Sequence, residues 1–165
     1  AEQSRARRYA SLIRDLIGDR TPARVLEIGC GSGALLRALA ADWSRARFEG
    51  IEAAPALAAL PSGDARIAKR QGFAEDLRPG GSGHELVFSI NVVEHASDPV
   101  VFLRALADQT VAGGTIVIVC PSGASPNLEL VFADHLHTFT VDSFRLLAAQ
   151  AGLAVTQHQD RPEGL

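Results

Sequence analysis

Apolar and polar positions along this chain follow two alternating patterns. Short runs that are almost wholly apolar, such as 24–28 and 115–120, are typical of buried strands. The longer segments between them repeat apolar residues every three or four positions, as a helix with one buried face does. In the first of these segments, 2–17, the apolar stripe comprises Tyr9, Leu12, Ile13, Leu16 and Ile17. This alternation predicts a parallel sheet with covering helices.

Turn residues and helix caps set the expected boundaries. Gly18 ends the first helix, and Asp98 caps a later one that has Pro99 at its first position. We expect strands at 24–28, 47–51, 66–71, 85–90 and 115–120, and a last strand that starts at 153–156. We expect helices at 2–17, after Gly33, at 55–60, from Pro99 to Gly113-Gly114 and at 141–150. These elements form a three-layer, Rossmann-like α/β sandwich with a mainly parallel sheet and helices on both faces.

Composition and charge narrow the class of protein. The 165 residues are 47% hydrophobic and 21% charged, which fits one globular domain over 1–165. The net charge of −3 gives no basic surface, so neither nucleic acid nor a membrane surface is a predicted partner. No apolar run approaches the length of a membrane span. The chain has no methionine and starts with alanine, so we expect a piece of a longer polypeptide.

The number of cysteines indicates the redox environment of the protein. Cys30 and Cys120 are the only two, too few for a disulfide framework, so a reducing cytoplasmic location is predicted.

The sharpest local feature is a glycine-rich turn that follows the first strand. Gly29, Gly31 and Gly33 permit unusual backbone dihedrals and let a ligand approach bare backbone. The helix that starts beyond Ser32 offers free amides and a partial positive charge to an anionic group. A plain strand–helix turn would use the same glycines, so their spacing alone leaves that alternative open.

Two acids near this turn indicate a nucleoside-containing ligand. Glu52 closes the second strand, where an acid can accept both hydroxyls of a ribose. Glu27 ends the first strand and would repel the pyrophosphate of a dinucleotide, although Gly29, Gly31 and Ala34 fit the looser dinucleotide pattern. The sulfonium and ammonium of S-adenosylmethionine suit Glu27 instead.

The segment Val25-Leu26-Glu27-Ile28-Gly29-Cys30-Gly31-Ser32-Gly33 resembles motif I of the class I S-adenosylmethionine-dependent methyltransferases, of the type that acts on small molecules. The segments Ala74-Glu75-Asp76-Leu77, 91–99 and Gly113-Gly114-Thr115 also resemble this family. The resemblance implies S-adenosylmethionine as cofactor and a small molecule as methyl acceptor. The cofactor-binding residues that it implies are Glu27, Gly29, Cys30, Gly31, Gly33, Glu52, Ala53, Phe73, Ala74, Glu75, Asn91 and Val92.

The sequence departs from the family in two places. Many relatives carry an acid that bonds the adenine amino group, and Phe73 stands at that position here. The family's sheet has a seventh strand that pairs with the sixth, and residues 157–165 are too short and broken to form it. We therefore expect the seventh strand to be absent and the open sheet edge to be covered by a homodimer or an adjoining domain.

Histidines follow the fourth and fifth strands, where ligands of such sheets bind. His135, which the family pattern matches best, and His95 are the expected catalytic residues, with a purely structural role open for each. Asp134, His135 and His137 lie close enough in sequence to suggest a metal, but no cysteine accompanies them and no metal is predicted. Tyr9 is expected to be a packing residue; the alternative, from the resemblance, is that the helix at 1–18 lies over the cofactor as a lid, with Tyr9 touching the ligand.

We therefore expect methyl transfer from S-adenosylmethionine to an oxygen, nitrogen or carbon of a small molecule. A catalytically silent S-adenosylmethionine-binding module of a larger protein is one alternative. An NAD(P)-dependent oxidoreductase is another, and Glu27 argues against it.

Overall fold

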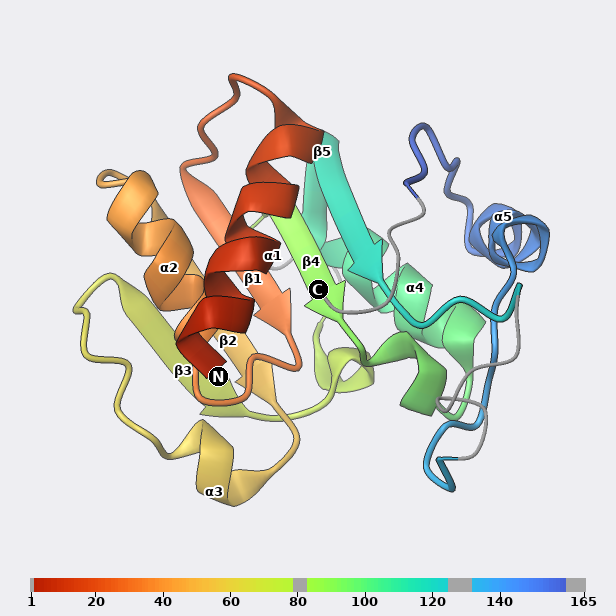
Figure 1. Ribbon diagram of the computed structural model, residues 1–165, viewed down its shortest axis with the longest axis horizontal. Helices are drawn as coiled ribbons and strands as arrows, with labels where there is room; N and C mark the ends of the chain where they lie inside the picture. Colours follow the sequence, from red (N-terminus) through yellow and green to blue (C-terminus); the bar gives the residue numbers. More distant parts are fainter. Residues whose placement is uncertain (1, 79–82, 125–131, 160–165) are drawn as a thin grey trace.

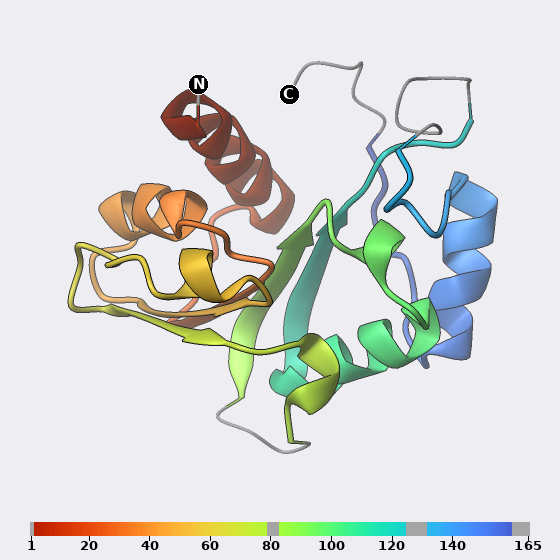
Figure 2. The same cartoon turned by 90° about the horizontal axis from the view of Figure 1, so that it is seen from below.

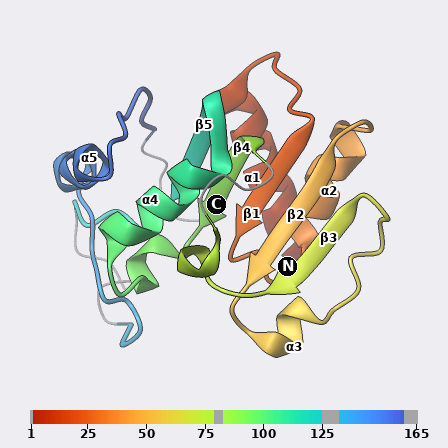
Figure 3. The ribbon, with the colours of Figure 1, turned by 180° about the vertical axis from the view of Figure 1, so that it is seen from behind.

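A five-stranded parallel sheet forms the centre of the computed structural model, which describes residues 2–78, 83–124 and 132–159. The strand order is β3-β2-β1-β4-β5, so the central β1 pairs with β2 on one side and with β4 on the other (Figures 1 and 3). The strands are β1 (Arg24–Ile28), β2 (Arg47–Glu52), β3 (Ile67–Gln71), β4 (His84–Ile90) and β5 (Thr110–Val119).

Helices cover both faces of this sheet. They are α1 (Glu2–Ile17), α2 (Ala34–Asp42), α3 (Pro55–Ala58), α4 (Pro99–Gln109) and α5 (Val141–Gln150), with short 3-10 helices η1 (Ala74–Asp76) and η2 (Val93–His95). Figure 2 shows α1 and α2 on one side and α4 and α5 on the other. The three-layer α/β sandwich predicted from the apolar pattern is confirmed.

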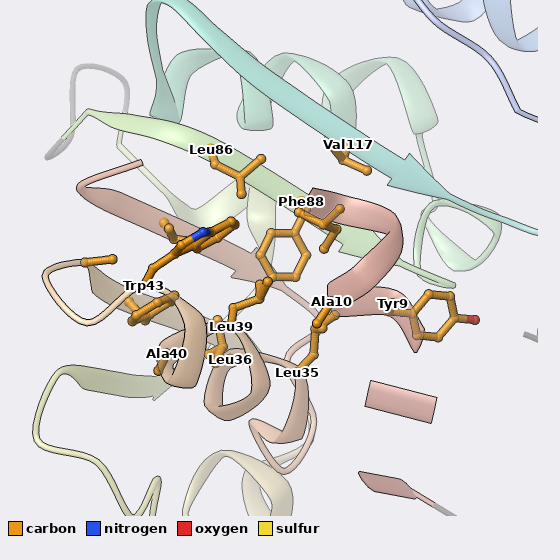
Figure 4. Close-up of a cluster of buried hydrophobic side chains, with 14 of the residues drawn as sticks. Tyr9, Ala10, Leu35, Leu36, Leu39, Ala40, Trp43, Leu86, Phe88 and Val117 are labelled. Atoms are coloured by element: carbon orange, nitrogen blue, oxygen red, sulfur yellow. The ribbon is translucent and has the colours of Figure 1, made fainter. Parts of the chain in front are cut away.

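Strand alternation divides the core into two clusters. Val25 of β1 faces α1 and α2, whereas Leu26 and Ile28 face α4 and α5. In the first cluster the side chains of α2 pack against Phe88 and Leu86 of β4 (Figure 4). Both faces of the central strands are buried, which explains why their sequences are almost continuously apolar.

The fourth helix and the fifth strand meet earlier than predicted. The helix ends at Gln109 rather than at the glycine pair, and β5 starts at Thr110. The register with β4 jumps from Thr110 opposite His84 to Thr115 opposite Leu86, which marks a bulge. Gly114 lies inside this bulge. A side chain would clash at this position, because a Cβ there would be 2.6 Å from Cγ2 of Thr110. Gly113 and Gly114, which were predicted to end the helix, lie within β5 instead and allow this strand to bend.

The predicted last strand at 153–156 is wrong. Residues 153–159 follow α5 without strand structure, and no seventh strand occurs in the described ranges. Leu153 and Val155 still pack against the α4-side cluster, which accounts for the apolar pattern that suggested a strand. A strand also needs a partner for its backbone groups, and in the described part of the chain no strand pairs with the outer edge of β5.

Candidate functional site

A tight backbone turn joins β1 to α2. The amides of Gly29 and Cys30 donate to the carbonyl oxygen of Ile51, at 2.8 and 3.0 Å. Gly29 has φ of +78°, and a Cβ there would lie 2.3 Å from Cγ2 of Val92. Only glycine fits this position, because both the backbone dihedral and the close approach of Val92 exclude a side chain.

The amino end of α2 faces the same turn. Gly33 is its N-cap residue, with φ of +80°, and no side chain caps the helix there. The hydroxyl of Ser32 bonds instead to the carboxylate of Glu2, which ties the start of α1 to the glycine turn. The first amides of α2 are thus available to an anionic group of a ligand.

Glu52 lies across the turn at the carboxyl end of β2. One oxygen of its carboxylate accepts from the amide of Gly31 at 2.7 Å, and the other accepts from the amide of Ala54 at 2.9 Å. These bonds fix the acid beside the glycine turn, with Ala53 next to it in the chain. Carboxylate oxygens retain further lone pairs after accepting one bond each, so Glu52 is positioned to accept ribose hydroxyls.

Glu27 is a buried carboxyl group beneath this turn. Its residue is 4% exposed, and among the described residues its Oε2 atom has no hydrogen-bond partner. Burial, and then the charge of Glu52, raise the pKa of Glu27 to about 8, while Lys69 on β3 opposes the shift. A cationic ligand group at this position would stabilise the carboxylate.

The segment after β3 borders the same edge of the sheet. The amide of Gly72 donates to the carbonyl of Glu52 at 3.1 Å, which places Phe73 beside the end of β2. Ala74 is buried against the ends of the central strands, whereas the Phe73 side chain is 59% exposed and Glu75 is exposed. An exposed aromatic ring next to the expected ribose site is suited to stacking on a nucleobase.

The end of β4 completes the predicted cofactor region. Asn91 has φ of +53° and donates its amide to the carbonyl of Val119 at 2.8 Å. The next residue, Val92, contacts Gly29 closely, as described above. The cofactor-binding residues predicted on the ends of four strands therefore lie along one edge of the sheet, and their contacts with a ligand stay a prediction.

The second part of the site lies where η2 meets the segment 132–140. The amides of Leu136 and His137 both donate to the carbonyl of Glu94, at 2.9 and 3.1 Å. His95 Nδ1 lies 2.7 Å from the carbonyl oxygen of Asp134, and the rings of His95 and His135 are 4.7 Å apart. The two histidines predicted to be catalytic, which are distant in sequence, are thus in contact.

Glu94 follows the fourth strand with His95 and was a candidate from the sequence, with local capping or pairing as the alternative, but its contact with His135 was not predicted. Its residue is 1% exposed, and within the described residues one ligand atom each of Glu94, His95 and His135 lies within 4.8 Å of the others. His137, weighed with Asp134 and His135 as a metal ligand, stacks on Phe139 instead. The adjacent pair Glu94-His95 is the signal for this cluster in the sequence, and it does not indicate that His135 lies beside the pair.

Tyr9 of the first helix has the packing role expected of it, while the lid role of the helix stays a prediction. Tyr9 is 8% exposed and belongs to the core cluster between α1 and α2 (Figure 4). It therefore serves packing in this structure, and α1 reaches the glycine turn through the hydrogen bond from Ser32 to Glu2.

The sheet order, the glycine turn and the acids beside it define a Rossmann-like domain of the class I S-adenosylmethionine-dependent methyltransferase type. The family model described as "Methyltransferase domain" matches residues 1–158, so the chain belongs to this family.

Similar proteins of known name agree with this assignment. A ubiquinone biosynthesis O-methyltransferase from Azorhizobium caulinodans is 33% identical over 100 residues, which cover 58% of this chain and 39% of that relative. The chain thus spans about two fifths of the length of this curated relative.

Solved structures share the fold. The YcgJ protein from Bacillus subtilis has a TM-score of 0.72 at 17% identity, and the match covers 87% of this chain and 67% of that one. The plantazolicin methyltransferase BpumL, in complex with a monoazolic desmethylPZN analog and SAH, has a TM-score of 0.70 at 18% identity, with 87% and 60% covered.

Proposed function

We propose that this chain binds S-adenosylmethionine and transfers its methyl group to a small-molecule acceptor. The observation that carries this proposal is the convergence of Glu27, the glycine turn and Glu52 at the carboxyl ends of parallel strands, where α/β sheets bind ligands. Support also comes from the family match and from a similar structure that holds SAH. Bound S-adenosylmethionine would supply an activated methyl group, so the protein mainly positions the reactants.

Each residue of the cofactor region has a defined task in this proposal. Glu27 faces the amino group of the cofactor, and the first amides of α2 face its carboxylate. Glu52 accepts the ribose hydroxyls. The ring of Phe73 and the backbone at Ala74 would hold the adenine, since Phe73 stands where many relatives carry an acid.

The acceptor would lie beside His95 and His135. Phe132 and Leu136, on either side of His135, are 49% and 59% exposed, so this surface suits an acceptor with an apolar part. His135 is placed to take the proton of an acceptor group, with His95 in edge-on contact with its ring. An oxygen acceptor is favoured because the relative from Azorhizobium caulinodans is named an O-methyltransferase. Among the described residues, no helix has the length and apolarity needed to span a membrane.

Calorimetry with S-adenosylhomocysteine tests the cofactor site. The wild-type chain should bind it, and Glu52→Ala should weaken binding by about 1–3 kcal/mol, the scale of a lost hydrogen bond to a charged group. Glu49→Ala is the matched control, because Glu49 is on the same strand but lies beside His84. Equal affinity of wild type and Glu52→Ala would remove Glu52 from the site.

A transfer assay over phenols, amines and activated carbon acceptors tests the reaction. Turnover with one of these classes would identify the acceptor atom. Binding of the cofactor product without turnover across the panel would favour a silent binding module. Tight binding of NAD in place of S-adenosylhomocysteine would favour the oxidoreductase alternative.

A further inference from the structure

Three metal-ligating side chains meet at the contact between η2 and the segment 132–140. Glu94 and His95 come from η2, and His135 comes from the other segment. One ligand atom from each lies within 4.8 Å of the others. Two imidazoles and a carboxylate are the donor set that Zn²⁺ and related first-row transition ions accept in proteins.

One ring nitrogen of His95 is fixed by a contact with the backbone. Its Nδ1 atom lies 2.7 Å from the carbonyl oxygen of Asp134, and a carbonyl oxygen can only accept. The hydrogen of the neutral ring is therefore on Nδ1, which leaves the lone pair on Nε2 for a metal. Metal-ligating histidines almost always donate their other ring N–H in this way, and the partner fixes the tautomer and the ring plane.

Glu94 is held in place by the same contact. Its carbonyl accepts from the amides of Leu136 and His137, so the backbone of η2 is fixed against the segment that carries His135. The side chain of Glu94 is buried, and a buried carboxylate is costly unless positive charge is near it. A divalent cation bound to the cluster would add positive charge beside this carboxylate.

The spacing requires only a small adjustment. Two ligand atoms of one tetrahedral Zn²⁺ are roughly 3.4 Å apart, as follows from bond lengths of about 2.0–2.2 Å. The three ligand atoms, at most 4.8 Å apart, would close in by about 1.4 Å or less. His135 is half-buried, so rotation of its side chain can supply this movement.

We propose that Glu94, His95 and His135 form a binding site for a divalent transition-metal ion of the Zn²⁺ type, with coordination positions left open towards the acceptor. This site requires neither the cofactor nor the acceptor. Its role rests on the proposed function and replaces one part of it: with the ion bound, His135 is a ligand rather than the base, and the ion would lower the pKa of a bound acceptor hydroxyl, whose proton leaves to solvent. The oxygen then bonds to the methyl carbon as the carbon–sulfur bond breaks and its electron pair stays on sulfur.

Titration of the metal-stripped chain with Zn²⁺ alone tests the site. Wild type should bind one ion, and His95→Ala, His135→Ala and Glu94→Gln should each weaken binding by at least about 100-fold, since loss of even an outer-shell partner costs about 10–100-fold. His137→Ala is the matched control, because His137 is in the same segment but stacks on Phe139, and it should change affinity less than about 3-fold.

A spectrum of the wild-type chain with Co²⁺ does not depend on any variant and keeps the test valid if a variant misfolds. Visible ligand-field bands of four- or five-coordinate Co²⁺ should appear at one equivalent and disappear when Zn²⁺ is added. The proposal is overturned if wild type binds no ion stoichiometrically, or if His137→Ala weakens binding as much as His135→Ala does.

The metal site and the methyl transfer can fail separately. If the chain does not bind S-adenosylhomocysteine, the proposed function fails while the Zn²⁺ titration still decides the metal site. If transfer proceeds at the same rate after the metal is stripped, the role of the ion in activating the acceptor is excluded, and His135 acts as the base itself.

Discussion

The two halves of the candidate site are built in different ways. In the cofactor half, the turn after β1 bonds directly to the end of β2, through Gly31 to Glu52 and through Gly29 to Ile51. In the acceptor half, η2 meets a segment about 40 residues further along the chain, and backbone amides of that segment bond to the carbonyl of Glu94. Neighbouring strand ends thus form the first half, whereas the second half exists only after two distant segments dock.

Under the proposed function, this difference would separate positioning of the cofactor from chemistry on the acceptor. Substitutions in the first half should change the fold or the affinity for the cofactor. Substitutions in the second half should change the rate and leave that affinity intact. The predictions below test this separation.

The largest effect is expected for His135→Ala. Loss of a positioned acid–base group typically slows a reaction by about 10²–10⁴-fold, and loss of a metal ligand acts on the same step. The affinity for S-adenosylhomocysteine should change less than about twofold, because His135 lies in the acceptor half. Single-turnover rates and calorimetry on the same preparation measure both quantities. His137→Ala, the matched control, should transfer methyl groups at close to the wild-type rate, and equal rates for all three proteins would assign His135 to structure.

The next effect is on stability and concerns Gly29. Gly29→Ala should destabilise the fold by roughly 2–5 kcal/mol, which combines about 1–2 for the left-handed backbone with about 1–3 for the clash with Val92. Gly31→Ala should cost only the backbone part, since among the described residues no atom lies within 4 Å of its Cβ position. Urea unfolding measures both.

A second substitution separates the two causes at Gly29. Val92→Ala, introduced into Gly29→Ala, removes the atom 2.3 Å from the new Cβ and should restore the part of the stability that the clash removed. If Gly29→Ala and Gly31→Ala unfold at the same urea concentration, close packing at Val92 does not determine this turn.

The cofactor half could be predicted because its determinants are local. A strand, glycines and an acid at the end of the next strand follow one another along the sequence, and the apolar runs fix which face each strand residue occupies. The structure places Glu27, Gly29 and Glu52 together, as the motif implies. Phe73 likewise lies in the segment after β3, beside the end of β2, as the resemblance implied.

The acceptor half could be predicted only in part, because its contacts are tertiary. His95 was singled out by residue type and position and His135 by the family pattern, but nothing in the sequence shows that these two residues and Glu94 meet. The start of β5 was misplaced for a similar reason: the bulge depends on the register with β4, not on the residues of β5 alone. Residues 153–156 have the apolar pattern of a strand and pack against the core through Leu153. Whether such a segment forms a strand depends on a neighbouring strand that pairs with its backbone.

Glu27 gives the third prediction, which concerns pH. With its pKa raised to about 8 by burial and by Glu52, the free site is protonated at neutral pH. A ligand ammonium favours the carboxylate, so binding releases a proton and affinity rises with pH, by up to about tenfold per unit below 8. Glu27→Gln should bind more weakly and with no such slope.

The measurement for Glu27 is calorimetry with S-adenosylhomocysteine between about pH 6 and 7.5, below the range near 7.7–8.0 in which an α-amino group loses its own proton. Titrations in buffers of different ionisation enthalpy should show proton release for wild type. Glu52→Gln should weaken binding and keep proton release, but over a lower pH range, because Glu27 stays buried while the charge of Glu52 no longer raises its pKa. A slope that persists in Glu27→Gln would assign the proton to another group.

The smallest effect concerns the N-cap of α4, which follows η2 directly. The carboxylate of Asp98 accepts from the amides of Val100 and Val101 at 2.9 and 3.1 Å. Asp98→Ala should lower the free energy of unfolding by about 1 kcal/mol, whereas Asp98→Asn keeps an acceptor and should lose less. Because α4 supports the acceptor half, we expect both variants to bind S-adenosylhomocysteine as wild type does. A loss of affinity that follows the loss of stability would mean that the two halves fold and bind as one unit.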